Sequence, residues 1–187
     1  MPNYLGFKKE VSNKVIKQAQ AGDINALEII YKTYAAACYA LAFRISCDKS
    51  LSQDVVHDAF IKIMEKISSL KDFSLLVPWI KKIVSNETIN QLKRRNRIEF
   101  LDEDTEKSLI TNDLFDQHWL ATCKDLNKLL SNLSDTSRIV LVLHEIEGFN
   151  HKEIANVFNK TESFSKVTLS RAYKALKKNS ITEGEIL

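Results

Sequence analysis

Apolar residues recur along most of this chain at spacings of three and four, and no run of alternating β-branched residues interrupts them. An α-helix produces this period when one of its sides faces a core. The period is cleanest over residues 52–70, where the apolar stripe comprises Val55, Val56, Ala59, Phe60, Ile63 and Ile67. A longer apolar helix is expected between Gly22-Asp23 and a loop at residues 48–51. The pattern predicts an all-α protein.

Near the C-terminus the pattern predicts three short helices around one small core. Ser134 is placed to cap the first helix and Gly148 to end it. Asn150 and Glu153 have the spacing of a capping box for the second helix, and a tight turn at residues 159–161 leads to the third. Two short helices around such a turn, the second with a basic outer side, are typical of a helix-turn-helix that enters the DNA major groove. The same hairpin also fits an all-helical protein that binds no DNA.

A polar ladder marks another predicted helix, of which Pro78 is well placed to be the first residue. After an apolar start, this helix carries polar or basic residues on successive turns and at its end: Lys82, Asn86, Asn90, Lys93, Arg94 and Arg95. Two asparagines inside a helix cost helix propensity, which suggests a role beyond solvation. The spacing alone fits a solvated basic helix end equally well.

Charge divides the chain into two blocks and a strip between them. Residues 1–98 carry 16 Lys and Arg against 9 Asp and Glu, whereas residues 99–118 carry 1 against 7. The acidic strip also lacks a helical period, as expected of a linker. We therefore expect a helical domain at residues 1–97, an acidic linker at 98–118 and a second helical domain at 119–187.

The sequence offers no candidate for catalysis or for a cofactor. It contains no Gly-rich phosphate loop and no nucleophile elbow. The three cysteines are an odd number without metal-site spacing, and His118 with Cys123 is an isolated pair of possible metal ligands. No apolar stretch approaches the roughly 20 residues that span a bilayer, and no signal peptide opens the sequence. We expect a cytoplasmic protein with no metal, no cofactor and no membrane insertion.

The C-terminal motif resembles a known family. The order L-S-x-x-S-R-x-V-L-x-L-H-E-I-E-G-F-N-H-K-E-I-A, followed by T-E-S-F-S-K-V-T-L-S-R-A, is similar to the promoter-reading domain of bacterial RNA polymerase sigma factors of the short extracytoplasmic-function type. The resemblance implies that the helix after the turn contacts the promoter −35 element through Ser163, Phe164, Lys166, Val167, Thr168, Ser170, Arg171 and Lys174. Ser163 stands where a glycine is usual and Phe164 where a small hydroxyl residue is usual, so the −35 preference of the family does not transfer.

Two further segments resemble the same family. S-Q-D-V-V-H-D-A-F-I-K-I is similar to the segment that docks on the clamp helices of the largest polymerase subunit, which implies a polymerase-binding role for Asp54, His57, Asp58, Phe60 and Ile61. His57 replaces the commoner Gln there. P-W-I-K-K-I-V-S-N-E-T-I-N-Q-L-K-R-R is similar to the segment that holds the −10 element, which implies DNA contacts for the polar ladder from Lys82 to Arg95.

The three matching segments occur in the family's order, which implies a sigma factor that binds core RNA polymerase and directs promoter-specific initiation through −10 and −35 contacts. It would catalyse nothing itself. Its expected partners are core RNA polymerase, promoter DNA and an anti-sigma factor, which often holds members of this type inactive. Two alternatives stay open on the residues alone: a stand-alone helix-turn-helix repressor or activator, with residues 1–98 for dimerisation or sensing, and a helical adaptor that binds no nucleic acid.

Overall fold

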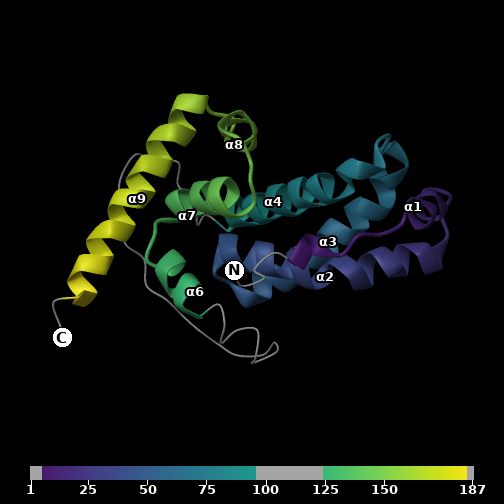
Figure 1. The fold of residues 1–187 in the computed structure, drawn as a ribbon, viewed down its shortest axis with the longest axis horizontal. Helices are drawn as coiled ribbons and strands as arrows, with labels where there is room; N and C mark the ends of the chain where they lie inside the picture. Colours follow the sequence, from purple (N-terminus) through teal and green to yellow (C-terminus); the bar gives the residue numbers. More distant parts are fainter. Residues whose placement is uncertain (1–5, 96–123, 185–187) are drawn as a thin grey trace. The chain divides into compact units, whose positions relative to one another are not determined.

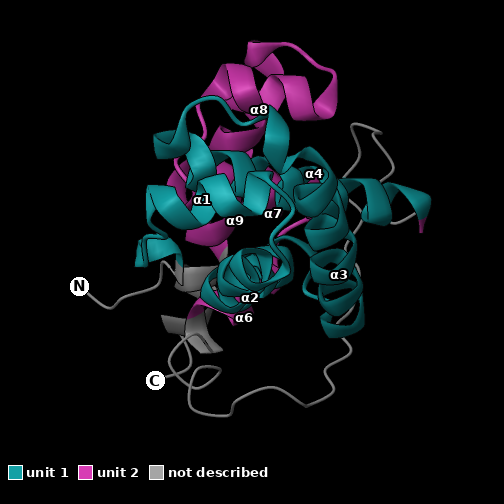
Figure 2. Cartoon of the chain, turned by 90° about the vertical axis from the view of Figure 1, so that its right-hand side faces the viewer, with its two compact units in different colours: residues 1–94 teal, residues 95–187 magenta. Residues whose placement is uncertain are grey.

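The computed structural model describes residues 6–95 and 124–184, and every regular element in these two ranges is a helix (Figure 1). The predicted all-α class is therefore confirmed. The chain divides into two compact units, residues 1–94 and 95–187, which are coloured separately in Figure 2. The expected acidic linker at residues 98–118 lies outside the described residues.

The first unit is built around three long helices that pack against one another, α2, α3 and α4. Its elements in chain order are η1 (Gly6–Lys8), α1 (Asn13–Gln20), α2 (Ile24–Ser46), α3 (Lys49–Lys66), η2 (Ile67–Ser69), η3 (Phe73–Leu75) and α4 (Leu76–Arg94). The short helix α1 packs on α2, and its Gln20 side chain donates hydrogen bonds to the carbonyl oxygens of Ile67 and Leu70, at 2.9 and 2.8 Å. The apolar stripe predicted for residues 52–70 faces this core, since all six of its members are buried.

Local capping explains where the long helices begin. The Asp23 carboxylate accepts a hydrogen bond from the backbone N–H of Asn25 at 2.8 Å and thereby starts α2. Asp48 caps α3 through the N–H of Leu51 at 2.9 Å. Cys47, in the left-handed conformation with φ of 51°, ends α2 directly before it. The loop predicted at residues 48–51 is therefore wrong for residues 49–51, which belong to α3. The cap of α2 at Cys47 and the cap of α3 at Asp48 complete the connection.

The start of α4 also differs from the prediction. The 3₁₀ turn η3, capped by Asp72, runs directly into α4, which begins at Leu76. Pro78 is then the third helical residue and not the first. It is tolerated there because the N–H groups of the first helical turn have no partner within the helix, so the missing donor costs nothing.

The second unit contains the predicted helix-turn-helix. Its elements are α6 (Lys124–Ser131), α7 (Asp135–Leu141), η4 (Val142–Ile146), α8 (His151–Phe158) and α9 (Glu162–Gly184). Both α7 and α8 pack on α9. The predicted capping box is present, with Asn150 and Glu153 each accepting from the other's backbone N–H at 2.9 Å. Asn159 closes α8 in the left-handed conformation, with φ of 53°.

One local feature of this unit was not predicted. The helix that begins after Ser134 does not continue as a regular α-helix but widens into a π-helical turn, η4. The N–H of Glu147 donates to the carbonyl of Val142 at 3.0 Å, five residues back, and the N–H of Phe149 to that of Leu143 at 2.9 Å. Gly148 has a positive φ of 77° and ends the segment as expected. Such turns accommodate an extra residue and occur often at functional sites.

Candidate polymerase and nucleic-acid interfaces

Helix α9 presents one exposed face along its first half. This recognition face consists of Ser163, Lys166, Val167, Ser170, Arg171 and Lys174, all of which are exposed. The opposite side carries Ser165, Leu169 and Ala172, which are buried in the unit. Spacings of three and four put all six exposed side chains on one side of the helix. The face combines three positive charges with two hydroxyls and the side chain of Val167, which is 48% exposed.

Two of the residues predicted for −35 contact are placed differently. The ring of Phe164 is half-buried and packs on that of Phe158, with 5.4 Å between the centroids. Thr168 is only 6% exposed. Both side chains lie beside the buried stripe of α9, because its period of 3.6 residues brings positions 164 and 168 next to Ser165 and Leu169. We therefore assign them to the packing of α9 and leave them out of the recognition face.

Helix α4 carries the polar ladder on its outer side. Lys82, Asn90 and Arg94 are exposed, as is Arg95 in the turn that follows the helix, whereas Asn86 and Lys93 are half-buried. The inner side remains buried as far as Leu92, and it includes the polar residues Ser85, Glu87 and Thr88. The Thr88 hydroxyl donates to the carbonyl of Val84 at 2.7 Å, so this polar group stays satisfied inside the unit. The ladder is thus the solvent side of a helix that is anchored along its whole length.

The predicted polymerase-binding residues of α3 divide into exposed and buried members. Asp54, His57 and Ile61 are exposed. Phe60 is 4% exposed, and its ring meets that of Tyr31 edge-on at 4.7 Å. Phe60 is therefore a core residue, since the stripe of α3 that faces α2 includes it.

Sequence reasoning missed two exposed apolar side chains near Asp54, His57 and Ile61. These are Tyr31 of α2 and Met64 of α3, each 47% exposed. Met64 lies three residues after Ile61 and seven after His57, so the helical period could have added it. The helical period of α3 could not have identified Tyr31, because Tyr31 lies on α2 and its proximity to α3 depends on how the two helices pack. Together, Asp54, His57, Ile61, Met64 and Tyr31 form what we call the α3 strip.

Two polar bridges join α3 to α4. Lys62 forms an ion pair with Glu87, whose side chain is buried. Four residues earlier on α3, the carboxylate of Asp58 accepts a hydrogen bond from the Gln91 amide at 2.9 Å. The equal spacing on both helices means that they run antiparallel, and the bridges fix their register. Asp58, predicted to contact polymerase, therefore already holds the helix that carries the polar ladder.

Other kinds of site find no support in the ranges described. Across residues 6–95 and 124–184, no group of three or more possible metal ligands lies together. The candidate ligands His118 and Cys123 fall outside these ranges. None of the helices described is at once long and apolar enough to cross a bilayer.

Two family models match the chain, one in each unit. The model for Sigma-70 region 2 matches residues 30–98, which include most of α2 and all of α3 and α4. The model for Sigma-70, region 4 matches residues 123–176, which contain α6 to α8 and the first part of α9. The α3 strip and the polar ladder thus lie in the first match and the recognition face in the second.

Individual relatives span nearly the same length. The chain is 27% identical over 165 residues to RNA polymerase sigma factor YlaC of Bacillus subtilis, which covers 86% of this chain and 95% of the relative. It is 26% identical over 152 residues to the ECF RNA polymerase sigma factor SigM of the same bacterium, with 81% and 93% covered.

Two solved structures share the fold. The structure of CnrH in complex with the cytosolic domain of CnrY has a TM-score of 0.57 at 19% identity and covers 90% of this chain and 96% of its own. The sigma factor RpoE in complex with the anti-sigma factor NepR, from Bartonella quintana, has a TM-score of 0.56 at 22% identity, with 83% and 96% covered. Both family models and the relatives agree with the three-segment resemblance in the sequence. The chain belongs to the extracytoplasmic-function type of RNA polymerase sigma factors, and its function is promoter-specific initiation of transcription with RNA polymerase.

Proposed function

We propose that this protein binds core RNA polymerase through the α3 strip and reads a promoter with two separate helices, α4 at the −10 element and α9 at the −35 element. The observation that carries the proposal is that each unit presents an exposed helix face rich in polar and basic side chains: the polar ladder in the first and the recognition face in the second. Each lies inside the matching family region.

The α3 strip has the composition of a protein-binding surface. Tyr31, Ile61 and Met64 supply exposed apolar area, and Asp54 and His57 precede them on the same side of α3. Interfaces commonly combine an apolar core with a polar rim, and tyrosine and methionine are enriched in them. A basic or amphipathic helical surface on the polymerase would complement this strip.

The polar ladder suits a DNA strand whose bases have been exposed. Lys82, Arg94 and Arg95 supply positive charges that can hold phosphates. Asn86 and Asn90 lie one turn apart, and their amides offer a donor and an acceptor to base edges. The buried inner side of α4 and the bridges to α3 hold the ladder in a fixed orientation, which base reading requires.

The recognition face suits the major groove of a duplex. Arg171 has the fork of donors that pairs with guanine, whereas Lys166 and Lys174 act as point charges toward phosphates. Val167 supplies apolar surface that can contact a thymine methyl group. Because Ser163 and Phe164 depart from the usual residues, the −35 sequence has to be determined for this protein.

The polymerase makes these separate contacts useful together. A net charge of only +3 gives the free chain little general attraction to DNA. When the enzyme holds both units, binding of one raises the effective concentration of the other at its own promoter element. The proposal includes a cytoplasmic location and no catalytic step, since the polymerase performs the chemistry.

An anti-sigma partner is part of the proposal. The two structural relatives were both solved in complexes, one with the cytosolic domain of CnrY and one with the anti-sigma factor NepR. The exposed apolar side chains of the α3 strip, at Tyr31, Ile61 and Met64, give such a partner a surface to cover. Covering it would prevent polymerase binding directly.

Reconstitution tests the function. The full chain is mixed with core RNA polymerase from its own bacterium, and run-off transcription is measured on a library of randomised promoters. We expect defined start sites that are absent with core polymerase alone. The variant Ile61→Asp should abolish them, because it places a charge in the apolar part of the α3 strip. The variant Lys14→Asp, at an exposed position of α1, should leave them. A chain that yields no defined start with active core polymerase would refute the proposal.

A further inference from the structure

A cluster of titratable side chains lies behind the recognition face, where η4, α8 and the first turn of α9 meet. The rings of His144 and His151 stack with 4.5 Å between their centroids and 21° between their planes. His151 is the first residue of α8, and its Nδ1 lies 3.0 Å from the hydroxyl oxygen of Ser165 in α9. Ser165 is fully buried, so this hydrogen bond joins the two helices of the helix-turn-helix inside the unit.

The second ring of the stack is held from its own side. Nδ1 of His144 lies 2.8 Å from a carboxylate oxygen of Glu145, and the Tyr173 hydroxyl of α9 donates a hydrogen bond to the same carboxylate. The bond from Tyr173, with that from His144, keeps the pKa of Glu145 below its ordinary value. Glu145 therefore stays charged. It is held by Tyr173 of α9 and in turn fixes the orientation of His144 in η4.

The π-helical turn makes the stack possible. It occupies Val142–Ile146 and leaves Val142 and Leu143 both buried, while His144 is directed toward the start of α8. The continuous α-helix expected from the sequence would wind this segment differently. The cluster therefore depends on a local geometry that the sequence pattern does not predict.

We propose that His151 is a positioning residue for the recognition helix, and that its protonation in mildly acidic solution releases the first turn of α9 and weakens −35 binding. This inference rests on the proposed function of the recognition face. Lys166, which belongs to that face, directly follows Ser165, so any shift at Ser165 moves a DNA-contacting residue.

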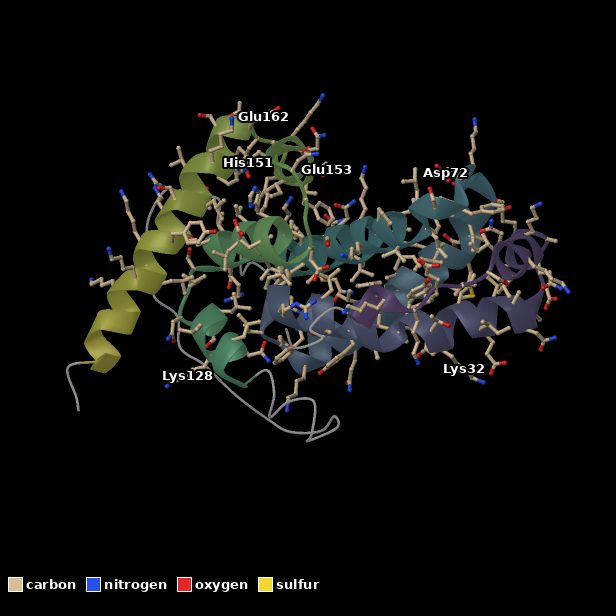
Figure 3. All side chains as sticks on the ribbon, viewed as in Figure 1. Lys32, Asp72, Lys128, His151, Glu153 and Glu162 are labelled. Carbon is tan, nitrogen blue, oxygen red and sulfur yellow. The ribbon has the colours of Figure 1, made fainter. Side chains whose placement is uncertain are left out.

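The electrostatic surroundings give this positioning its pH dependence. Burial lowers the pKa of His151, and the neighbouring His144 and Lys166 lower it further, while Glu162 and Glu145 partly oppose them. Figure 3 labels His151 and Glu162 where α8 approaches the start of α9. A positive charge on His151 would also lie at the N-terminus of α8, where the helix dipole disfavours it.

Protonation has a direct chemical effect on the contact. A neutral imidazole can accept the Ser165 hydroxyl proton at Nδ1, whereas a protonated imidazole carries hydrogen on both nitrogens and can only donate. The contact would then run from Nδ1–H to the Ser165 oxygen, and the buried hydroxyl proton of Ser165 would need another acceptor.

The sign of the pH effect follows from the direction of the shift. Because the pKa of His151 is lower in the folded protein than in the unfolded chain, the unfolded chain binds the proton first as pH falls. The stability that neutral His151 contributes is complete above its ordinary pKa of 6.5 and is lost as pH falls through the lower folded value. The recognition helix is therefore best positioned at neutral and alkaline pH.

The test measures promoter binding by the reconstituted holoenzyme between pH 5.5 and 8. The probes are two fragments of a promoter selected from the library, identical except that one carries a scrambled −35 element. We call the affinity for the intact fragment divided by that for the scrambled fragment the affinity ratio. Any effect of pH on the polymerase or on −10 binding cancels in this ratio. We expect the wild-type ratio to be highest near neutral pH and to fall several-fold in acid, by about tenfold at most for each unit of pKa shift.

Three variants separate positioning from folding. His144→Phe keeps a stacked ring that cannot take a charge, and His151→Asn keeps a side-chain hydrogen-bonding group near Ser165 without titrating. His151→Asn should lose most of the decline in acid, whereas His144→Phe removes one of the groups that lower the pKa of His151 and should shift the decline toward higher pH. Ser165→Ala should lower the ratio several-fold already at neutral pH. Circular dichroism of each variant checks that the helices remain folded.

The outcomes distinguish this inference from the proposed function. A wild-type ratio above one that does not change with pH would overturn the pH inference and leave −35 reading intact. A ratio of one at every pH would overturn both. A decline that persists unchanged in His151→Asn would overturn the role of His151. An NMR titration in which His151 takes its proton at or above its ordinary pKa would do so as well.

Discussion

Arg171 offers the most direct test of base reading at the −35 element. It is exposed in the middle of the recognition face, and its guanidinium can donate two parallel hydrogen bonds to a guanine. A lysine at this position would offer only a point charge. Its contribution can therefore be separated from that of the neighbouring lysines by comparing sequences.

We expect Arg171→Ala to reduce holoenzyme affinity for the selected promoter by about 1–3 kcal/mol and to relax preference at one −35 base pair. Affinity is measured on the promoter and on single-base variants of its −35 element. Lys14→Ala, which removes an exposed positive charge from α1, is the matched control and should change neither. An equal loss on every sequence would assign Arg171 to a phosphate instead.

Phe164 tests the distinction between packing and reading. Because its ring packs on Phe158, Phe164→Ala should lower the free energy of unfolding by about 1–3 kcal/mol. Phe164→Leu should retain most of the stability and nearly all of the −35 affinity. Chemical denaturation and promoter binding measure the two quantities. Should the leucine variant fold normally and yet lose −35 preference, the side chain reads DNA after all.

At the scale of elements, helix boundaries followed from the sequence where one cap decides them. Asn150 with Glu153 and Ser134 capped the predicted helices because each acts on backbone groups within three residues. Features that depend on distant neighbours did not follow. The proximity of Tyr31 to α3 depends on how α2 packs, and the π-helical turn depends on packing within the second unit.

The exposed faces were predictable for the same reason. A period of three and four places Lys82, Asn90 and Arg94 on one side of α4 wherever the helix lies. The bridges behind that side were not predictable, since Lys62 and Glu87 are 25 residues apart and meet only through the packing of α3 on α4. Sequence reasoning thus found the polar side of α4 and missed the bridges that fix α4 against α3.

The Lys62–Glu87 bridge gives a prediction at this scale. Lys62→Met leaves the buried Glu87 carboxylate without its cation and should lower the free energy of unfolding by about 1–3 kcal/mol, less than for a fully buried pair because Lys62 is partly exposed. The double variant Lys62→Met with Glu87→Met should recover most of this loss. Urea unfolding measures both.

The variant Lys66→Met removes an exposed lysine from the same helix and controls for the loss of a surface charge. A double variant as unstable as the single one would mean that the bridge contributes more than relief of a buried charge. Transcription by the double variant adds a second readout, because altered register between α3 and α4 would change −10 preference even in a stable protein.

For the whole molecule, the proposed division of promoter recognition between two units implies that binding depends on the polymerase. Neither the polar ladder nor the recognition face is large, and the net charge is +3. Weak separate contacts allow the free protein to leave DNA quickly. The holoenzyme gains both contacts at once, so promoter choice is exercised only by the complete enzyme.

This dependence is measurable as a difference in affinity and salt sensitivity. We expect the free chain to sediment as a monomer and to bind the selected promoter at least about 100-fold more weakly than the holoenzyme. Holoenzyme binding should also fall more steeply with salt, because more phosphates are neutralised. A free dimer that binds the promoter as tightly as the holoenzyme would indicate a stand-alone regulator.

The π-helical turn at Val142–Ile146 has a consequence for how this protein tolerates changes in length. An α-helix rotates by about 100° per residue. Removing one residue from the turn would restore regular α-helical winding and rotate the residues before the deletion by this angle relative to those after it. His144 would swing away from His151, and Glu145 away from Tyr173, although no other residue had changed. A single deletion here should therefore change how −35 binding depends on pH.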